Sequence, residues 1–323
     1  MNTLLEVEGL SVRLPTNRGP VTIVDDVDYH VERGQVFGVA GESGSGKTIS
    51  VLALMRLLPA GSTTSGSARY GGQDLLKLRP RALREVRGAE LAMVFQDPLT
   101  SLHPMLSIGR QLTEHVRLHL GLGRRDAERH ALASLADVRI PDPASALRAF
   151  PHQFSGGMRQ RIAIAIALAC RPKLLIADEP TTALDVTVQA GILRLLDRLR
   201  RENDLSVVLI THDLGVMSAI ADRVSIFYAG KVVEAGSREA VLSTPRHPYT
   251  RALLDALPHP EEAQDKPLVA IAGAPPSPGS IPSGCSFHPR CAYAQESCVH
   301  DVPPLVAAGD RLLACPIDPL VER

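Results

Sequence analysis

Short apolar blocks along the chain predict buried strands that are followed by helices. The run at residues 36–40 has the length of a strand and precedes a segment, residues 49–58, that is rich in helix-forming residues. A second apolar run, at residues 174–177, is typical of a buried parallel strand. These blocks predict an α/β fold built on a mostly parallel sheet.

Three further patterns predict how this sheet is extended and interrupted. Residues 3–33 predict an antiparallel edge. Residues 224–236 predict a β-hairpin that turns at Ala229-Gly230. A helical insert is expected at about residues 97–165.

Proline marks a change of composition in the last quarter of the chain. More than half of the 25 prolines follow residue 240, and several lie in AGAPPSPGSIPSG at 272–284. A segment with this composition cannot build long helices or central strands. We therefore predict a first domain at 1–240 and a C-terminal extension at 241–323 that is irregular beyond about residue 258.

Charge and hydropathy exclude several classes of protein. The 323-residue chain has 35 Lys and Arg against 35 Asp and Glu, so no overall basic field attracts nucleic acid, and no nucleic-acid partner is expected. Its longest apolar stretch, Ile162–Cys170, is far shorter than the ~20 residues of a membrane span. The first residues, MNTLLEVEGLSV, lack the basic start and apolar block of a signal peptide. These features predict a cytosolic protein, in which thiols stay reduced and disulfides are unexpected.

A glycine-rich loop lies between the first predicted strand and helix, and it matches G-x-x-x-x-G-K-[ST] at every fixed position. The backbone N–H groups of such a loop close around phosphate oxygens at the start of a helix. Lys47 supplies a charge to the β- and γ-phosphates, and Thr48 offers a hydroxyl to Mg²⁺. The predicted phosphate-binding residues are Gly41, Glu42, Ser43, Gly44, Ser45, Gly46, Lys47 and Thr48.

An acidic pair follows the second apolar run, in KLLIADEP at residues 173–180. Asp178 and Glu179 sit at the carboxyl end of this strand, where open α/β sheets bind their ligands. Asp178 is suited to Mg²⁺, directly or through water, and Glu179 could polarise the attacking water as a general base. Such a pair could equally cap a helix, but the phosphate-binding loop favours the catalytic interpretation.

The run FSGGMRQRIAIAIALACRPKLLIADEPTTALDVT, residues 154–187, resembles the signature-to-D-loop region of ATP-binding cassette (ABC) proteins. The resemblance implies ATP as the nucleotide. It also implies that Ser155, Gly156 and Gly157 contact the γ-phosphate of ATP held by the opposite subunit. Asp185 would belong to the loop that crosses the dimer interface.

Two more motifs extend the resemblance to about residues 1–240. VFQDP supplies Gln96, implied to lie near Mg²⁺ and the attacking water, and VVLITHD supplies His212, implied to face the γ-phosphate. Two positions depart from the family. Met158 stands where the signature often has glutamine, and Leu14 stands where an aromatic ring often stacks on adenine.

Three segments resemble the ATP-binding subunits of oligopeptide and dipeptide importers: residues 95–116, residues 243–258 and the proline-rich tail with its cysteines. The resemblance implies an ATPase at the cytoplasmic face of the membrane that drives peptide uptake. It also implies a second ATPase subunit (homologous or identical), two membrane permease subunits and an external solute-binding protein as partners. A nickel-importer ATPase, or a soluble ABC ATPase not coupled to transport, remains an alternative.

Four of the five cysteines gather near the end of the chain with the spacing C-x5-C-x6-C-x16-C, whereas Cys170 is expected to be a small core residue. Unpaired thiols, disulfides, a zinc site and a [4Fe–4S] cluster are all compatible with four cysteines. The resemblance to peptide importers implies the [4Fe–4S] cluster, with Zn²⁺ as the alternative. Its role would be structural or regulatory, because the cysteines are far in sequence from the ATP motifs. The predicted ligands are Cys285, Cys291, Cys298 and Cys315.

Overall fold

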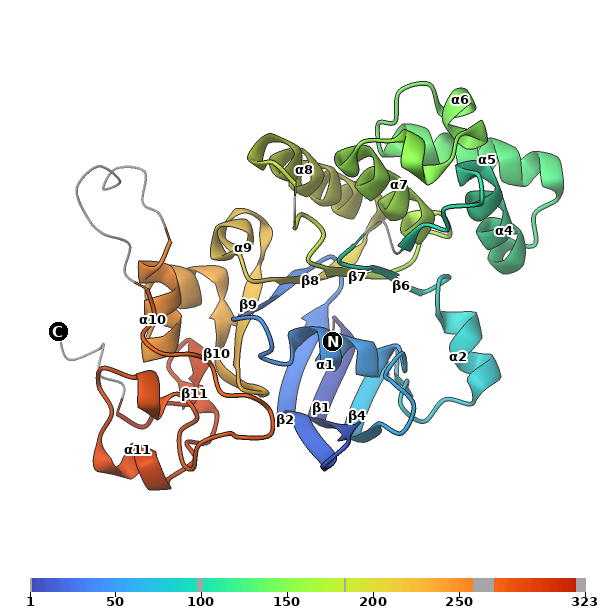
Figure 1. Cartoon of the computed structure of the whole chain (residues 1–323). Helices are drawn as coiled ribbons and strands as arrows, with labels where there is room; N and C mark the ends of the chain where they lie inside the picture. The colour runs from blue at the N-terminus through green and yellow to red at the C-terminus, as the bar shows by residue number, and fades with distance from the viewer. Residues whose placement is uncertain (1, 98–100, 183, 258–269, 318–323) are drawn as a thin grey trace. The chain divides into compact units, whose positions relative to one another are not determined.

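The computed structural model describes residues 2–97, 101–182, 184–257 and 270–317 of the chain (Figure 1). Parts of two predicted segments, residues 98–100 and 258–269, therefore lie outside the described residues, as do residues 318–323. The backbone groups into two compact units. The first unit comprises residues 1–31, 36–77 and 211–323, and the second comprises residues 32–35 and 78–210.

An antiparallel sheet of four strands lies in the first unit, and it confirms the antiparallel edge predicted near the N-terminus. Apolar side chains of β1 such as Leu5, Val7 and Val12 are buried. A bulge between Glu8 and Ser11 shifts the register of β1 against β4, so alternation resumes beyond it in a new phase. The strands, in spatial order, are β2 (Gly19–Glu32), β1 (Thr3–Thr16), β4 (Thr63–Tyr70) and β5 (Gln73–Asp74).

A second sheet in the first unit includes β3 (Val36–Ala40), which is buried along its whole length. This strand pairs in parallel with β9 (Arg223–Tyr228), which turns into β10 (Lys231–Ser237). The turn residues Ala229 and Gly230 both have positive φ, 48° and 85°, which confirms the predicted hairpin.

The C-terminal extension adds two strands to this sheet, which the sequence had not predicted. β12 (Arg311–Leu313) pairs antiparallel with β10, and β11 (Val306–Ala308) pairs antiparallel with β12. The remainder of the extension consists of short helical turns and irregular segments, as expected. The two strands can pair because residues 305–314 contain no proline. Every residue there therefore keeps the backbone N–H that donates a hydrogen bond to the neighbouring strand.

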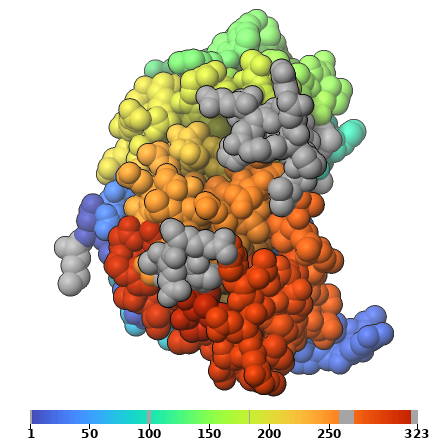
Figure 2. Space-filling view, turned by 90° about the vertical axis from the view of Figure 1, so that its left-hand side faces the viewer, coloured from blue at the N-terminus to red at the C-terminus, as the bar shows by residue number. Residues whose placement is uncertain are grey.

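Helices of the first unit are short. Helix α9 packs against β3 so closely that a β-carbon at Gly38 would lie 2.5 Å from the Met217 sulfur. Figure 2 shows the orange and red residues of this unit as a continuous surface. The helical elements are α1 (Lys47–Leu54), α9 (Leu214–Ile220), η2 (Glu239–Ser243), α10 (Pro248–Asp255), η3 (His288–Arg290) and α11 (Glu296–His300).

The second unit contains three parallel strands and most of the long helices. Strand β7 (Leu174–Asp178) lies between β6 (Leu91–Val94) and β8 (Ser206–Thr211), as predicted for a buried parallel strand. No helix within the described residues combines the length and the apolar content needed to cross a bilayer. The helices are α2 (Pro80–Val86), α4 (Ile108–Leu120), α5 (Arg124–Asp137), α6 (Pro143–Arg148), η1 (Pro151–Gln153), α7 (Gly156–Leu168) and α8 (Val186–Asn203).

A buried ion pair joins the added strand β12 to β10 within the first unit. Glu234 on β10 is 0% exposed and accepts a hydrogen bond from the Arg311 guanidinium at 3.1 Å. The same carboxylate accepts the backbone N–H groups of Arg246 and His247 at 2.9 and 3.1 Å. Glu234 thus joins β10, β12 and the start of α10 at one point.

Replacing Arg311 should destabilise the first unit strongly. Arg311→Ala leaves the Glu234 carboxylate buried without its cation, which costs about 3–5 kcal/mol of unfolding free energy. Arg251→Ala in the same unit removes an exposed pair with Asp255 at 3.8 Å and should cost at most about 0.5 kcal/mol. Chemical denaturation of both variants measures the difference. Equal costs would contradict the structural role given to Glu234.

Candidate nucleotide-binding and catalytic site

The glycine-rich phosphate-binding loop, residues 41–48, is called the P-loop below, and it joins β3 to α1 in the first unit. Lys47 is 5% exposed, and its ammonium group donates hydrogen bonds to the carbonyl oxygens of Gly41 and Glu42, at 2.8 Å each. The lysine therefore lies over the loop, within reach of an anion placed there. Gly46 has no side chain that could cap α1, and the positive end of this helix dipole lies at the loop, where it favours an anion.

One buried hydroxyl in this loop fits the binding of phosphate. The Ser45 oxygen is buried and has no hydrogen-bond partner among the described residues. Leaving such a group unsatisfied is costly, and an anionic oxygen in the loop would satisfy it. Together with Lys47 and the helix start, this hydroxyl makes the loop suited to a phosphate group.

Backbone packing explains two of the three glycines in the loop. A β-carbon at Gly41, where φ is 145°, would lie 2.2 Å from the carbonyl oxygen of Phe227. A β-carbon at Gly46, where φ is 100°, would lie 2.8 Å from the carbonyl oxygen of Ile23. Gly44 also has positive φ, 79°, but a β-carbon there would meet nothing within 4 Å.

The second unit brings three of the predicted residues together at the end of β7. Asp178 is the last residue of the strand and is 3% exposed. The Glu179 carboxylate accepts hydrogen bonds from the Gln96 amide at 2.9 Å and from the Thr182 hydroxyl at 2.8 Å. Both bonds reach the same oxygen, Oε2, so the orientation of this carboxylate is fixed.

Glu179 also has a strained backbone. Its φ is +45°, in the left-handed region that non-glycine residues rarely adopt, and its N–H donates to the carbonyl oxygen of Ile210 at 2.8 Å. Strain of this kind costs of order 1–3 kcal/mol and gathers at functional sites. No residue pattern around Glu179 indicates this conformation.

The signature residues lie at the start of α7 in the second unit. Ser155 caps this helix by accepting a hydrogen bond from the N–H of Met158 at 3.4 Å, so Met158 contributes its backbone here. Ser155 and Gly156 are exposed. A β-carbon at Gly157 would lie 2.6 Å from the Val188 side chain.

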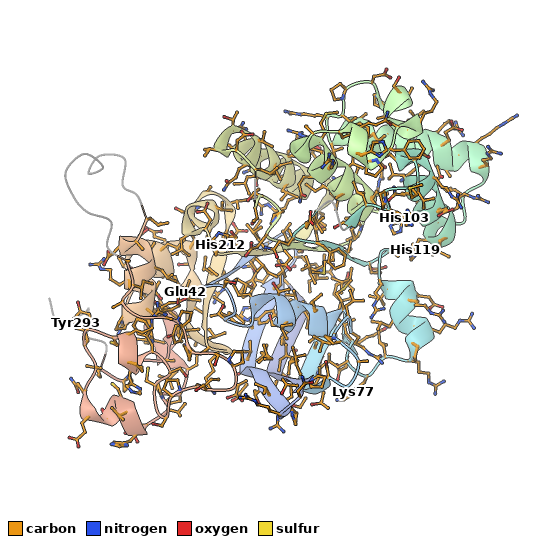
Figure 3. The ribbon with its side chains drawn as sticks, viewed as in Figure 1. Glu42, Lys77, His103, His119, His212 and Tyr293 are labelled. Atoms are coloured by element: carbon orange, nitrogen blue, oxygen red, sulfur yellow. The ribbon has the colours of Figure 1, made fainter. Side chains whose placement is uncertain are left out.

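The remaining predicted positions lie at element ends. Asp185 caps α8 by accepting the Val188 N–H at 2.9 Å. His212 follows β8, is exposed and belongs to the first unit, as does Glu42 (Figure 3). Leu14 is partly exposed near the end of β1, consistent with an apolar surface in place of an aromatic ring.

Two residues of the C-terminal extension contact the P-loop, and sequence analysis missed both. Arg290 forms an ion pair with the Glu42 carboxylate at 2.6 Å, and the Tyr249 hydroxyl accepts the Glu42 N–H at 2.8 Å. Hydrogen bonding to Glu42 raises the pKa of Arg290 above its ordinary value. The cysteine region is remote in sequence from every ATP motif, yet these contacts place Arg290, the residue before Cys291, directly against the P-loop.

The four C-terminal cysteines line one small pocket of about 20 Å³, which has room for about one water-sized sphere. Burial raises the pKa of the Cys291 thiol to about 11 and lowers the pKa of His247, which also lines the pocket, to about 3. No group of three or more His, Cys, Asp or Glu side chains among the described residues is arranged to hold a metal ion. The pocket cysteines are Cys285, Cys291, Cys298 and Cys315.

Cys170 is separate from this pocket. It lies just beyond α7, is 8% exposed, and burial raises the pKa of its thiol to about 11. This environment matches the expected small core residue.

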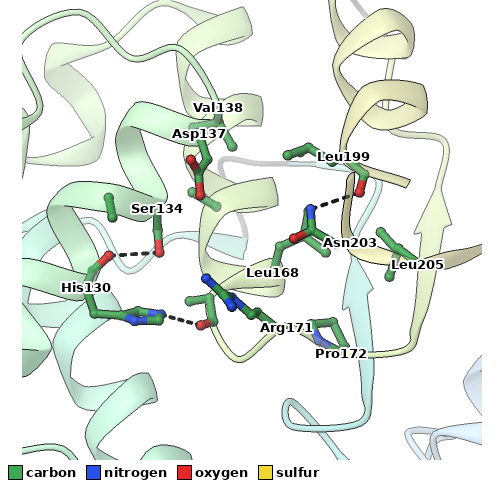
Figure 4. Close-up of a pocket in the computed structure, with 13 residues that line it drawn as sticks. His130, Ser134, Asp137, Val138, Leu168, Arg171, Pro172, Leu199, Asn203 and Leu205 are labelled. Atoms are coloured by element: carbon green, nitrogen blue, oxygen red, sulfur yellow. Dashed lines mark hydrogen bonds between the residues drawn. The ribbon is translucent and has the colours of Figure 1, made fainter. Parts of the chain in front are cut away.

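Another cavity, of about 80 Å³, lies among α5, α7 and α8 in the second unit (Figure 4). Two of its polar side chains are bonded to backbone: the His130 Nε2 lies 2.6 Å from the carbonyl oxygen of Ala169, and Asn203 donates to the carbonyl oxygen of Leu199 at 2.9 Å. None of the predicted site residues lines this cavity. Its small size is below that of ordinary ligand pockets.

Family comparisons agree with the motifs. Residues 24–182 match the family model described as ABC transporter, and residues 233–298 match that of the oligopeptide/dipeptide transporter C-terminal region. A putative peptide import ATP-binding protein of Brucella abortus is 50% identical over 314 residues, covering 97% of this chain and 94% of the relative. This chain belongs to the ATP-binding proteins of peptide-type ABC transporters.

Two further relatives are similar over almost the whole chain. The oligopeptide transport ATP-binding protein OppD of Salmonella typhimurium is 45% identical over 323 residues, with 99% of this chain and 96% of the relative covered. The dipeptide transport ATP-binding protein DppD of Escherichia coli is 47% identical over 309 residues, with 95% and 94% covered. The peptide-type ABC assignment therefore includes the C-terminal extension.

Solved structures support the fold. A bacterial ABC transporter cassette solved as a dimer is 26% identical, with a TM-score of 0.63, and the match covers 72% of this chain and 98% of that one. The cbiO1 subunit of an ABC transporter complex from Clostridium perfringens is 24% identical, with a TM-score of 0.64 and coverage of 75% and 92%. These structures confirm the predicted α/β fold of the ABC ATPase type. The chain is therefore an ATPase of the peptide-type ABC transporters.

Substitution of the first P-loop glycine tests the backbone packing. Gly41→Ala should lower the unfolding free energy of the nucleotide-free chain by about 3 kcal/mol, because its β-carbon collides with a backbone oxygen. Gly44→Ala adds only the cost of a left-handed alanine, about 1–2 kcal/mol. Urea denaturation compares the two variants, and equal losses would contradict the close approach at Gly41.

Proposed function

We propose that this chain is the ATP-hydrolysing motor subunit of a peptide importer, in which ATP binding and hydrolysis drive uptake through separate membrane subunits. The observation that carries the proposal is the presence in one chain of a full set of ABC motifs and the peptide-transporter C-terminal region. The names of the relatives, which are peptide import, oligopeptide and dipeptide proteins, favour peptides over nickel and over a soluble ATPase.

Within the nucleotide site we assign each residue the role that its position suits. The P-loop from Gly41 to Thr48 holds the phosphates, with Lys47 as the charged group. Thr48, Gln96 and Asp178 are the residues suited to Mg²⁺, which neutralises charge on the β- and γ-phosphates when bound. The hydroxyl, amide and carboxylate oxygens of these three residues are the hard donors that this ion prefers.

Glu179 is assigned as the general base, and His212 as a residue that faces the γ-phosphate. Gln96 and Thr182 both bond to Oε2 of Glu179, which fixes the orientation of the carboxylate. A carboxylate held in this way is preorganised to accept a proton from an attacking water. The strained φ of Glu179 supports the assignment, since strain at a strand end is tolerated where it places a reacting group.

Assembly follows from where the ATP motifs lie on the chain. Ser155 and Gly156 are exposed at the start of a helix, as an anion-binding helix end requires if its ligand comes from another molecule. Val186, beside Asp185, is 82% exposed, which suits a residue covered by a partner. We infer that two cassettes sandwich each ATP, the second being a homologous subunit or another copy of this chain.

The remaining partners are inferred from the relatives. Two permease subunits in the membrane and an external solute-binding protein would complete the importer, and this chain would dock peripherally at the cytoplasmic face.

Replacing the proposed base separates ATP binding from turnover. Glu179→Gln keeps the shape and hydrogen bonds of the side chain but removes the proton acceptor, so turnover should fall about 100- to 10,000-fold while ATP still binds. Glu202→Gln, an exposed glutamate paired with Arg198, is the matched control and should retain activity. Steady-state ATPase assays with parallel ATP-binding measurements test this. Near-normal turnover in Glu179→Gln would refute the assignment.

We also propose that the four-cysteine pocket holds a [4Fe–4S] cluster, with Zn²⁺ as the alternative. In its support, four thiols face a single pocket, and such a cluster takes four thiolate ligands on loops of irregular spacing. A single zinc ion would need sulfur atoms about 3.8 Å apart, from Zn–S bonds of about 2.3 Å in a tetrahedron. No group of three or more such side chains among the described residues is arranged to hold a metal ion, so the four thiols fit the cluster in donor number and type, and binding requires them to adjust around it.

Metal analysis decides among these alternatives. Protein purified without oxygen should be brown and contain about four irons per chain. Cys291→Ser should bleach the colour, whereas Cys170→Ser, at a cysteine outside the pocket, should not. One zinc in colourless protein would refute the cluster, and a metal-free folded protein would refute both.

A further inference from the structure

The P-loop carries a carboxylate at a place where an anion is bound. Glu42 is the second residue of the loop, and its side chain is 23% exposed. A negative charge there repels a triphosphate, and the repulsion is stronger near the low-dielectric protein than in bulk water. Nucleotide binding therefore requires a group that neutralises the Glu42 carboxylate or holds it away from the phosphates.

Arg290 supplies the opposite charge in a geometry that also fixes position. Its two terminal nitrogens donate to the two oxygens of Glu42, at 2.6 and 2.9 Å, which is the bidentate fork of an Arg–carboxylate pair. The Arg290 side chain is only 5% exposed. A bidentate pair with little exposure has one geometry, unlike exposed pairs that exchange with water.

The guanidinium is itself held from several directions. Its Nε donates to the carbonyl oxygen of Ala272 at 2.9 Å. Its central carbon lies 5.8 Å from the centre of the Tyr228 ring and 5.9 Å from that of Phe287. Arg290 therefore holds Glu42 at a place set by the C-terminal extension. These contacts leave the guanidinium little freedom to move if Glu42 moves.

A second contact holds the backbone of the same residue. The Glu42 N–H donates to the hydroxyl of Tyr249, a residue of α10 that is 0% exposed and packs against the Tyr228 and Phe287 rings. The amide and the carboxylate of Glu42 are thus both fixed by the extension. The carbonyl of Glu42 accepts from Lys47, so the fixed residue is also bonded to the phosphate-binding lysine.

We propose that Arg290 is a positioning residue for ATP binding, which holds the P-loop through Glu42 and cancels the charge that this carboxylate would present to the phosphates. The proposal rests on the P-loop's role in binding ATP. It assigns to the C-terminal extension a direct part in nucleotide affinity. Catalytic steps at Glu179 do not involve Arg290, so its effect is on binding and not on turnover of bound ATP.

Affinity and turnover are measured on the full chain with MgATP. Arg290→Ala should raise the dissociation constant and the KM for ATP about tenfold, the size of one lost charged hydrogen-bonded contact, with kcat little changed. Adding Glu42→Gln to Arg290→Ala should recover most of the lost affinity, because the uncompensated carboxylate is gone. A purely structural role for Arg290 would not be rescued in this way.

Matched variants control for folding. Arg246→Ala removes a guanidinium that bonds to the carbonyl oxygen of Ala308 in the same extension, and it should leave ATP affinity unchanged. Thermal unfolding of each variant reports whether the extension remains folded. If Arg290→Ala does not fold, Arg290→Lys keeps the charge but loses the fork and should raise the dissociation constant about threefold.

Several outcomes would overturn the proposal. These are an unchanged ATP affinity in folded Arg290→Ala (or in Arg290→Lys if only that variant folds), a loss of affinity in Arg246→Ala as large as in Arg290→Ala, or no recovery in the double variant. Failure of the unmodified chain to bind ATP would instead refute the proposed function. Because the measurement needs neither peptide nor membrane subunits, the two failures are distinguishable.

Discussion

Close contact between backbones is the constraint on which the nucleotide site depends. The P-loop passes the end of β9 at a distance where a β-carbon on Gly41 would overlap the carbonyl oxygen of Phe227. A β-carbon on Gly230, in the turn after β9, would likewise lie only 2.6 Å from the carbonyl oxygen of Ile23 on β2. The loop is therefore shaped by neighbours that are themselves strands, and a phosphate site built in this way is rigid before any ligand arrives.

That constraint explains why the hairpin and the C-terminal extension belong to the same unit as the P-loop. The hairpin forms one wall of the loop and also provides β10, the strand on which β12 pairs. Tyr228, the last residue of β9, packs against Tyr249 and Phe287 of the extension. The extension is thus continuous with the nucleotide-binding sheet of the first unit.

Local sequence signals predicted the elements well, because each is encoded within a few neighbouring residues. The P-loop glycines, the run before Asp178 and the turn at Ala229-Gly230 all have their signal and their structure at the same place in the chain. The ion pair of Glu42 with Arg290 spans 248 positions, and no periodicity or spacing links its two members. The left-handed backbone of Glu179 was hidden for another reason, since a glutamate has no intrinsic preference for it.

The cysteines show the same limit in a different form. The spacing of the four cysteines predicted a shared site but not the arrangement of their sulfur atoms. In the structure all four line one pocket. What the spacing did not reveal is that Cys291 directly follows Arg290, the residue bonded to the P-loop. Distance along the chain was a poor guide because Phe287, near Arg290, packs on Tyr228 of β9 and brings this part of the extension back to the sheet.

The buried Glu234 has a consequence for any truncated form of this chain. Its cation comes from Arg311 on β12, while the carboxylate itself lies on β10, a strand of the nucleotide-binding sheet. Loss of the last strands would leave this carboxylate without its cation, on a strand that has also lost a pairing partner. The stability of the ATPase core and the presence of the extension are therefore coupled through a single acid.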